Sequence, residues 1–360
     1  MSTEYRMDVY TASGVKLAEI ADFWQLSYRR QVNAPGVLSF AVSGGHRVVP
    51  QLEHNSQVIL YRRNPSLGLP WTAEFWGLFR GQKRSFSDHD VFEAACPGIL
   101  TMLGWRIVAW KAGTSNRSSF SSAEAETIMK TLVAYNAGPQ ATAANGRIRD
   151  GAIVGLSVEA DGGHGNTISL DCAYDNLLEV LQKVAAIGGG DFDLVKTDAQ
   201  AWEFRWYAGQ RGTDRTATLL FALERGNMAE PVYTYDRVDE RTVAIVGGPG
   251  EEASRAVVVR TGPDYGASND VEVFVDARNS STTDSLNASG DSKLQDTRAK
   301  QTFAFKVLQT PACYYGVHYG LGDLVKAQYG AVNVTQKIVG VSVSLDRGGA
   351  EKIDVEMQSV

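Results

Sequence analysis

The stretch FWQLSYRRQVNAPGVLSFAV, residues 23–42, sets the pattern of the first part of the chain. Its larger apolar residues roughly alternate with polar ones around Asn33-Ala34-Pro35, as they do on half-buried strands that a turn connects. Similar strand patterns separated by turn residues run from residue 5 to residue 96. Because several short strands with turns between them are typical of a small barrel or sandwich, we predict a first β-barrel domain over residues 1–98.

The pattern changes after Pro97 and Gly98, where helical periodicity begins. Apolar residues at helical spacing predict one helix over 121–138, with Ser121 and Glu124 as a capping-box pair, and a second helix over about 174–187. The segment 137–167 is polar and rich in glycine and alanine, which predicts an exposed loop with weak strands. We therefore expect a helical or mixed insert over residues 99–190.

Strand patterns resume near residue 192 and continue to residue 358. We expect residues 191–242 to complete the first barrel or the insert, and residues 243–360 to form a second β-barrel domain. Within that domain, residues 279–293 are predicted as a polar loop and residues 291–300 as one short helix. The predicted fold class is mainly β with a helical insert (α+β), in more than one domain, because single cores rarely grow beyond ~250–300 residues.

Composition limits the possible functions. The net charge is −6, and no segment has the strong basic excess that sequence-independent binding of nucleic acid needs. The three cysteines lie far apart without metal spacing, so we expect buried small apolar residues rather than disulfides or ligands. No stretch approaches the ~20 apolar residues of a membrane span, and no apolar signal segment is visible. We expect a soluble protein that is made in a cytoplasm.

No catalytic motif stands out in the sequence. The nucleophile elbow G-x-S-x-G, the zinc motif H-E-x-x-H and the Walker Gly-Lys-Ser/Thr are all missing. Asp191 with Asp193, and Asp175 with Glu179, are paired carboxylates, but acidic residues on solvated faces are the commoner explanation for such pairs. We therefore expect no catalytic residue, no bound metal and no cofactor.

Three residues are candidates for structural or contact roles. Arg29 is one of several arginines beside strand aromatics, which could face a neighbouring molecule or lie on a solvated outer face. Trp76 belongs to a set of strand aromatics for which core packing and interface anchoring both stay open. Asp323 follows Gly320 and Gly322 in YGLGDLV, which predicts a tight turn into a strand.

Several runs of the sequence resemble siphophage tail proteins of the baseplate-hub, or tail-tip hub, family. They include FWQLSYRRQVNAPGVLSF, QVILYRR followed by EFWGLFRG, AYDNLLEVLQKVA followed by GGGDFDLV, VAIVGGPGEEASR, VFVDAR and YGLGDLV. These runs occur in the same order as in that family, from about residue 20 to about residue 330. The segment 137–167 and the last 30 residues match less well.

The resemblance implies two tail-tube-type β-barrel domains and a non-enzymatic, structural role in the virion, at the tail tip. It also implies a homotrimer, whose two barrels per chain form a pseudo-sixfold ring. Such a ring would meet a distal tail protein ring above and a central fibre or lysin below, and DNA would pass only transiently through its lumen. The alternatives are a tail-associated glycan or peptidoglycan hydrolase, a carbohydrate-binding tail adhesin, and the hub of a contractile injection device.

Overall fold

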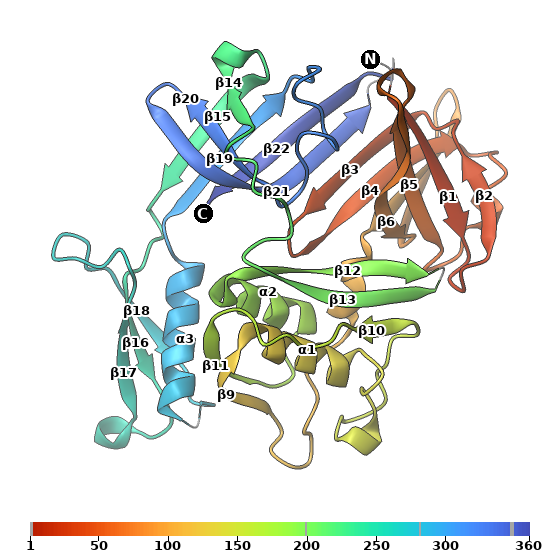
Figure 1. Ribbon diagram of the computed structural model, residues 1–360. Helices are drawn as coiled ribbons and strands as arrows, with labels where there is room; N and C mark the ends of the chain where they lie inside the picture. The colour runs from red at the N-terminus through yellow and green to blue at the C-terminus, as the bar shows by residue number, and fades with distance from the viewer. Residues whose placement is uncertain (1–2, 199, 281, 346–348) are drawn as a thin grey trace.

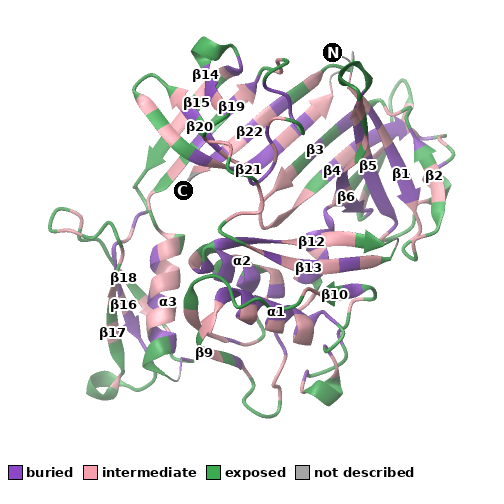
Figure 2. Ribbon diagram, in the orientation of Figure 1, coloured by how far each residue is buried: buried purple, intermediate pink, exposed green. Residues whose placement is uncertain are grey.

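The computed structural model describes residues 3–198, 200–280, 282–345 and 349–360. Its chain is mainly β with a helical insert, which confirms the predicted fold class (Figure 1). Buried residues concentrate on the strands at the centre of the molecule and on the faces of the helices that meet strands (Figure 2). No helix in the described residues is long and apolar enough to cross a membrane.

The N-terminal β unit comprises residues 4–97 and is built from two sheets around one core. Its smaller sheet has the order β2-β1-β5-β6, made of β1 (Glu4–Tyr10), β2 (Lys16–Ile20), β5 (Gln57–Asn64) and β6 (Leu69–Leu78). Its other strands are β3 (Gln25–Gln31), β4 (Ala34–Ser43), β7 (Gly81–Phe86) and β8 (Asp90–Pro97). The irregular start of β4 needs Gly36, because its φ is 64° and a Cβ there would lie 2.2 Å from the Arg29 carbonyl oxygen.

The C-terminal β unit continues the larger sheet of the N-terminal unit. Its strands are β14 (Leu220–Ala222), β15 (Met228–Asp236), β19 (Lys300–Val307), β20 (Leu324–Tyr329), β21 (Val332–Leu345) and β22 (Glu351–Ser359). The resulting ten-stranded sheet has the order β15-β19-β22-β21-β3-β4-β8-β7, with β20 and β14 branching from β21. The first part of β21 pairs with β20 and the second part pairs with β3. One hydrophobic core, from Phe40 and Phe92 to Phe303 and Val355, therefore spans both units.

The insert packs two helices against a small sheet. Its elements are β9 (Ser118–Glu124), α1 (Ala125–Asn136), β10 (Leu156–Val158), β11 (Thr167–Cys172), α2 (Leu177–Gly188), β12 (Gly190–Asp198) and β13 (Ala201–Ala208). The sheet has the order β10-β13-β12, and β9 pairs with β11. Ile128 and Leu132 of α1 share a core with Leu181 of α2 and with Phe192 and Phe204 of the sheet.

The predicted start of the first helix was wrong. Residues 121–124 are extended because β9 pairs with β11, so α1 begins only at Ala125 and Glu124 caps it without a side-chain hydrogen bond. The second helix matches the prediction closely. The side chain of Asn176 accepts hydrogen bonds from two backbone N–H groups of its first turn, and Gly189 ends it with a φ of 70°.

A peripheral unit follows, in which α3 (Thr283–Asp296) covers one face of a sheet with the order β17-β16-β18. The strands are β16 (Val243–Gly247), β17 (Val257–Thr261) and β18 (Glu272–Asp276). The loop predicted over 279–293 and the helix predicted over 291–300 were therefore misplaced; residue 281 of that loop lies outside the described residues. Thr282 forms a capping box with Ser285, and Leu286 and Leu294 are buried against the sheet, which explains the earlier helix start.

The predicted division at residues 98, 190 and 242 stays a prediction. Strands β19 to β22 pair within the same sheet as strands of the N-terminal unit, and not with the strands of residues 243–276. Within the described residues, strand pairing closes no sheet into a complete ring. The larger sheet thus contains strands of both β units, which join through β21 and β3.

Candidate functional site at the junction of the two β units and the insert

A buried ion pair joins the two β units. Arg62 on β5 donates hydrogen bonds from Nε and Nη2 to the two oxygens of Glu351 on β22, over 2.8 and 3.0 Å. The two side chains are only 6% and 8% exposed. Arg62 also donates to the Tyr315 carbonyl oxygen at 3.0 Å, while the Tyr5 hydroxyl donates to Glu351. Two hydrogen bonds in one plane fix the geometry of an Arg–carboxylate pair, so this contact sets how the units meet.

A second buried pair lies beside the first. Glu74 on β6 accepts hydrogen bonds from Arg30 Nη1 on β3, at 2.8 Å, and from the Tyr315 hydroxyl. We call these groups, with Tyr5, Arg62, Tyr314 and Glu351, the junction network. Strands β1, β3, β5 and β6 supply one side of the network, and the segment before β20 together with β22 supplies the other. Each carboxylate in the network has an arginine partner.

The surroundings of Tyr5, Tyr315 and Arg62 in the junction network shift their pKa values. Burial, together with Glu351, raises the pKa of Tyr5, and burial with Glu74 raises the pKa of Tyr315. Burial alone would lower the pKa of Arg62, but hydrogen bonding to Glu351 raises it above its usual value. The tyrosines therefore stay neutral and the arginine charged. Such a network suits rigid positioning rather than proton transfer.

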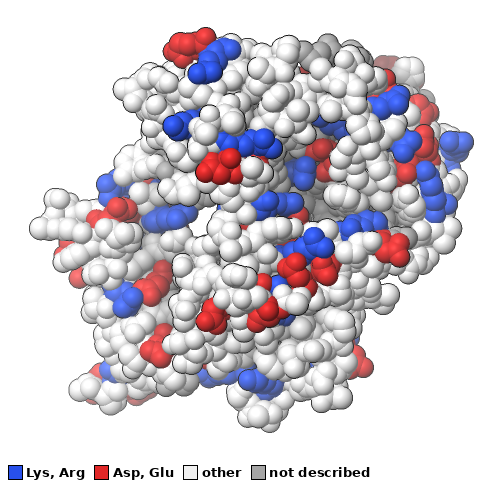
Figure 3. Space-filling model, in the orientation of Figure 1, with Lys and Arg blue, Asp and Glu red and all other residues white. Residues whose placement is uncertain are grey.

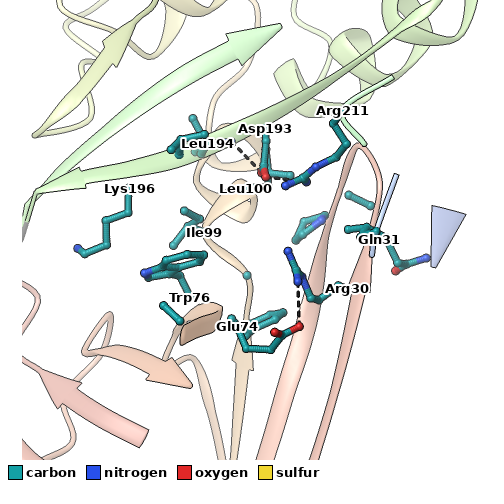
Figure 4. A pocket seen from close by; sticks show the side chains of 17 residues that line it. Arg30, Gln31, Glu74, Trp76, Ile99, Leu100, Asp193, Leu194, Lys196 and Arg211 are labelled. Atoms are coloured by element: carbon teal, nitrogen blue, oxygen red, sulfur yellow. Dashed lines mark hydrogen bonds and ion pairs between the residues drawn. The ribbon is translucent and has the colours of Figure 1, made fainter. Parts of the chain in front are cut away.

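A cleft of about 290 Å³ separates the N-terminal β unit from strand β12 of the insert (Figure 4). Arg30, Glu74 and Trp76 line one side, and Asp193 and Arg211 line the other. Arg211 Nη1 lies 2.6 Å from Asp193 Oδ2. Glu74 and Asp193 are thus each paired with an arginine, and neither carboxylate is left free for acid–base work.

Two further contacts tie β12 to the β units. Asp191, which is buried, pairs with Lys337 Nζ on β21 at 2.7 Å and accepts from the Arg211 backbone N–H at 2.8 Å. The turn residue Asn33 accepts a hydrogen bond from the Phe192 backbone N–H at 2.7 Å. The Asp191 and Asp193 pair, considered for hydrolysis, is therefore used in separate ion pairs that hold the insert in place.

The structure places the three predicted contact residues in three different regions. Arg29 lies on the outer face of the ten-stranded sheet, where its Nη2 is 2.6 Å from Glu356 and both side chains are nearly half exposed. Trp76 lines the cleft and packs against the insert core. Their roles in contacts with other molecules stay predictions.

Asp323 is a buried anchor of the turn that the sequence predicted. Its carboxylate accepts from the backbone N–H groups of Thr213, at 2.7 Å, and Gly320, at 2.9 Å, and from Arg215 Nε at 2.7 Å. The turn leads directly into β20, and Gly322 has a φ of 90°. Asp323 therefore connects the segment after the insert to the C-terminal β unit.

A buried carboxylate of a similar kind lies within the insert. Glu126, on α1, accepts hydrogen bonds from Lys130 Nζ at 2.5 Å and from both the backbone N–H and the ring Nδ1 of His164, at 2.9 and 2.6 Å. Burial alone would raise the pKa of Glu126, but these hydrogen bonds lower it to about 2. The contact fastens the loop around residue 164 to the start of α1.

The sequence reasoning missed Glu351, Glu74 and Tyr315 of the junction network. It considered Arg62 among the arginines that face a neighbouring molecule or solvent, which was wrong, because Arg62 is buried. A signal did exist for Arg62, because it follows Leu60 at strand spacing and so points into the core with it. Its partner Glu351 lies almost three hundred residues away, which no local pattern links. Cys96, Cys172 and Cys313 are buried, as predicted. The described residues contain no group of three His, Cys, Asp or Glu that could hold a metal.

Comparisons with known proteins identify relatives of this architecture. The profile of the family described as Siphovirus ReqiPepy6 Gp37-like protein matches residues 6–357. No curated protein sequence matches the chain. Among solved structures, a tail protein from Neisseria meningitidis is 12% identical, with 99% of this chain and 97% of that chain covered and a TM-score of 0.59.

Two further solved structures share the fold. The 43 kDa tail protein of prophage MuSo2 from Shewanella oneidensis is 11% identical, with 98% of each chain covered and a TM-score of 0.59. A chain of the Francisella PdpA–VgrG complex is 8% identical, with 100% of this chain and 58% of that chain covered and a TM-score of 0.57.

Proposed function

The chain belongs to the family of siphovirus ReqiPepy6 Gp37-like proteins, and from this premise we propose that it is the hub of a phage tail tip, where three copies form a ring. Its family membership shows that it is a structural component of the siphovirus tail. The observation that supports the ring is the ten-stranded sheet, whose main path ends in open edges at β15 and β7, while β14 ends its side branch. Within the described residues, the helices pack on other sheets.

The open edges favour a ring. Within the described residues, β15 and β7 end the main path of the sheet, and each pairs with one strand only. Their exposed residues include Tyr235 on β15 and Phe86 on β7, the latter 78% exposed. An open strand edge invites pairing with another chain. If β15 of one copy meets β7 of the next, the contact is head to tail, and repeating it closes a ring that pairs both ends of the main path.

The outer face of the ten-stranded sheet suits the lining of a DNA passage. The helices α1, α2 and α3 pack on other sheets. Many of the outward side chains are small and uncharged, namely Ser27, Ser39, Ala95, Thr234, Thr302, Ala304, Ser342 and Ser344, although Val37 and Val232 are also exposed on this face. The charges pair with each other within the face, as Arg29 does with Glu356 and Lys83 with Glu93 at 3.4 Å. Such a face offers a phosphate backbone no excess positive charge to bind.

The mass of the purified protein tests the ring. We expect light scattering after size-exclusion chromatography to give about 117 kDa, three times the 39.0 kDa of one chain. Tyr235→Lys and Phe86→Lys should each shift the protein to the monomer mass. Val238→Lys is the matched control, because Val238 is 85% exposed and lies just after β15. A monomeric wild-type chain, together with tail particles whose images lack threefold symmetry at the tip, would refute the proposal.

The proposed partners follow from the position of a hub. A distal tail protein ring would bind above it and a central fibre or tail-tip protein below it, and DNA would contact the lumen only while it passes. A hydrolase would instead need two free carboxyl groups, whereas Asp191, Asp193 and Glu74 are all held in ion pairs. Zymography on cell walls, with the purified chain, should therefore give no clearing.

The fold shared with the Francisella PdpA–VgrG chain favours one second candidate, the hub of a contractile injection device. The two candidates share the ring and differ in the surrounding machine. Electron microscopy of the particles that contain the chain separates them, because only a contractile device has a sheath around its tube.

A further inference from the structure

Three arginines at the end of the insert have no carboxylate partner. Arg106 follows the short 3-10 helix Ile99–Trp105, and Arg147 and Arg149 lie in the segment between α1 and β10. We call them the insert arginine cluster. In the described part of the chain, no ion pair involves any of the three. They concentrate positive charge in a chain whose net charge is −6 and whose basic and acidic side chains lie interspersed on the face shown in Figure 3.

The arginines are held close together by backbone contacts. Arg147 donates to the Arg149 carbonyl oxygen at 2.8 Å and to the Ile107 carbonyl oxygen at 3.4 Å. Arg106 Nε donates to the Gly151 carbonyl oxygen at 2.5 Å. Burial lowers the pKa of Arg106 and of Arg147, and Arg149 lowers both further, so each charge acts on its neighbours. Arg147 is buried, and its Nε has no hydrogen-bond partner.

Exposed apolar side chains flank the cluster. The Ile148 backbone N–H donates to the Ala109 carbonyl oxygen at 3.0 Å, which brings the two arginine-bearing segments side by side. Ile148 is 59% exposed and Ile107 is 44% exposed, and Trp105 next to Arg106 is also exposed. Like charges held together in a folded protein cost stability unless something compensates for them. Here no carboxylate of the described residues forms an ion pair with any of the three arginines.

We propose that the insert arginine cluster is a docking surface for an acidic segment of another protein, which places a carboxylate on the exposed Arg149, beside Arg106, and apolar side chains on Ile107 and Ile148. The buried Arg147 adds its positive charge from below the surface. Arginine forms two parallel hydrogen bonds with a carboxylate, and interfaces combine such pairs with apolar contacts. The apolar flanks favour a protein over nucleic acid, whose backbone presents only phosphate and sugar at its surface. This proposal does not depend on the ring, because the cluster lies on the insert.

A binding titration with defined probes tests the surface. The probe is a fluorescein-labelled twelve-residue peptide of alternating glutamate and leucine, added to the full-length protein at low ionic strength. We expect binding that weakens by at least about tenfold in Arg149→Glu, because the reversed charge repels the carboxylates. Ile148→Ser should weaken binding by about threefold, through loss of apolar contact. Both residues are exposed, so neither change disturbs the core.

Matched controls make the result specific. Arg225→Glu changes an exposed arginine of the C-terminal β unit and should alter binding by less than about twofold. A peptide with lysine in place of glutamate should not bind. Absence of binding by the glutamate peptide, or binding that Arg149→Glu leaves unchanged, would overturn the proposal. Tighter binding of a DNA duplex than of the peptide, lost in Arg149→Glu, would equally overturn it and assign the surface to nucleic acid.

Discussion

The junction network and the insert arginine cluster use charge in opposite ways. In the junction network, both buried carboxylates have arginine partners. The Arg62–Glu351 pair and the hydrogen bond from the Tyr315 hydroxyl to Glu74 tie the N-terminal and C-terminal β units together. In the insert arginine cluster, the guanidinium groups of Arg106 and Arg147 donate to backbone carbonyl oxygens, and within the described residues none of the three arginines forms an ion pair. Satisfied charge holds an architecture in place, whereas uncompensated charge on an otherwise acidic protein indicates a surface that gains from a partner.

Breaking the Arg62–Glu351 pair should have the largest effect on stability. Arg62→Met should lower the free energy of unfolding by about 3–5 kcal/mol, because it leaves Glu351 buried without its partner. Equilibrium unfolding in urea measures the loss. The double variant Arg62→Met with Glu351→Leu should recover most of it. Arg63→Met is the matched control, since Arg63 pairs with Glu4 at a more exposed position, and a loss as small as in this control would show that the junction pair is dispensable.

Asp323→Ala should have the next largest effect, about 2–3 kcal/mol, because two backbone N–H groups and Arg215 lose their acceptor. Asp323→Asn should cost less, since the amide oxygen still accepts. The same urea titration compares both with Asp214→Ala, which alters an exposed neighbour. Equal stability of Asp323→Ala and Asp214→Ala would contradict the anchoring role.

Glu126 offers a test by pH within the insert. Its pKa falls from 4.5 in the unfolded chain to about 2 in the folded one, so its stabilising contribution is full above about 4.5 and disappears as the pH falls to about 2. Glu126→Gln should therefore be less stable than the wild type by about 1–3 kcal/mol at pH 7. The difference should close as the pH falls through that window. Glu179→Gln, on the exposed side of α2, should show no such trend. If the stability difference between Glu126→Gln and the wild type stays the same at every pH, titration of Glu126 does not contribute to stability as proposed.

Arg29→Gln should have the smallest effect, below about 0.5 kcal/mol, because its pair with Glu356 is exposed and such pairs contribute little. Urea unfolding of a monomeric variant, for example Tyr235→Lys, measures how much the pair contributes to the free energy of unfolding of a single chain. Should Arg29→Gln cost several times more in the assembled wild type than in that background, Arg29 would be a contact between copies rather than an isolated surface pair.

The strand and helix composition was predictable because it depends on local patterns. Alternation around Asn33 gave β3 and β4, and the spacing from Leu177 to Val184 gave α2. The start of α1 was missed because Phe120 and Ala123 pair with residues near Leu170, a contact that overrides a capping pattern. The start of α3 was missed because only Leu286 and Leu294 mark its buried face in a polar segment.

The candidate site was less predictable, since its contacts join distant parts of the chain. Asp323 could be recognised from the glycines before it, because a turn is a local feature. Arg62 and Glu351 could not be recognised as partners, because neither local sequence indicates the strand order that brings β5 near β22. The insert arginine cluster was also missed, since Arg106 and Arg147 are separated by the whole of α1.

The pairing of β3 with β21 has a consequence for biosynthesis. Gln31 of β3 lies opposite Gly340 of β21. Strand β3 is therefore synthesised early but stays unpaired until β21, some three hundred residues later in the chain, has also been synthesised. Contacts of such long sequence separation slow folding, and the delay exposes an unpaired strand on the nascent chain. Premature association with neighbouring polypeptides is the hazard of this topology, and truncation before residue 332 would make that exposure permanent.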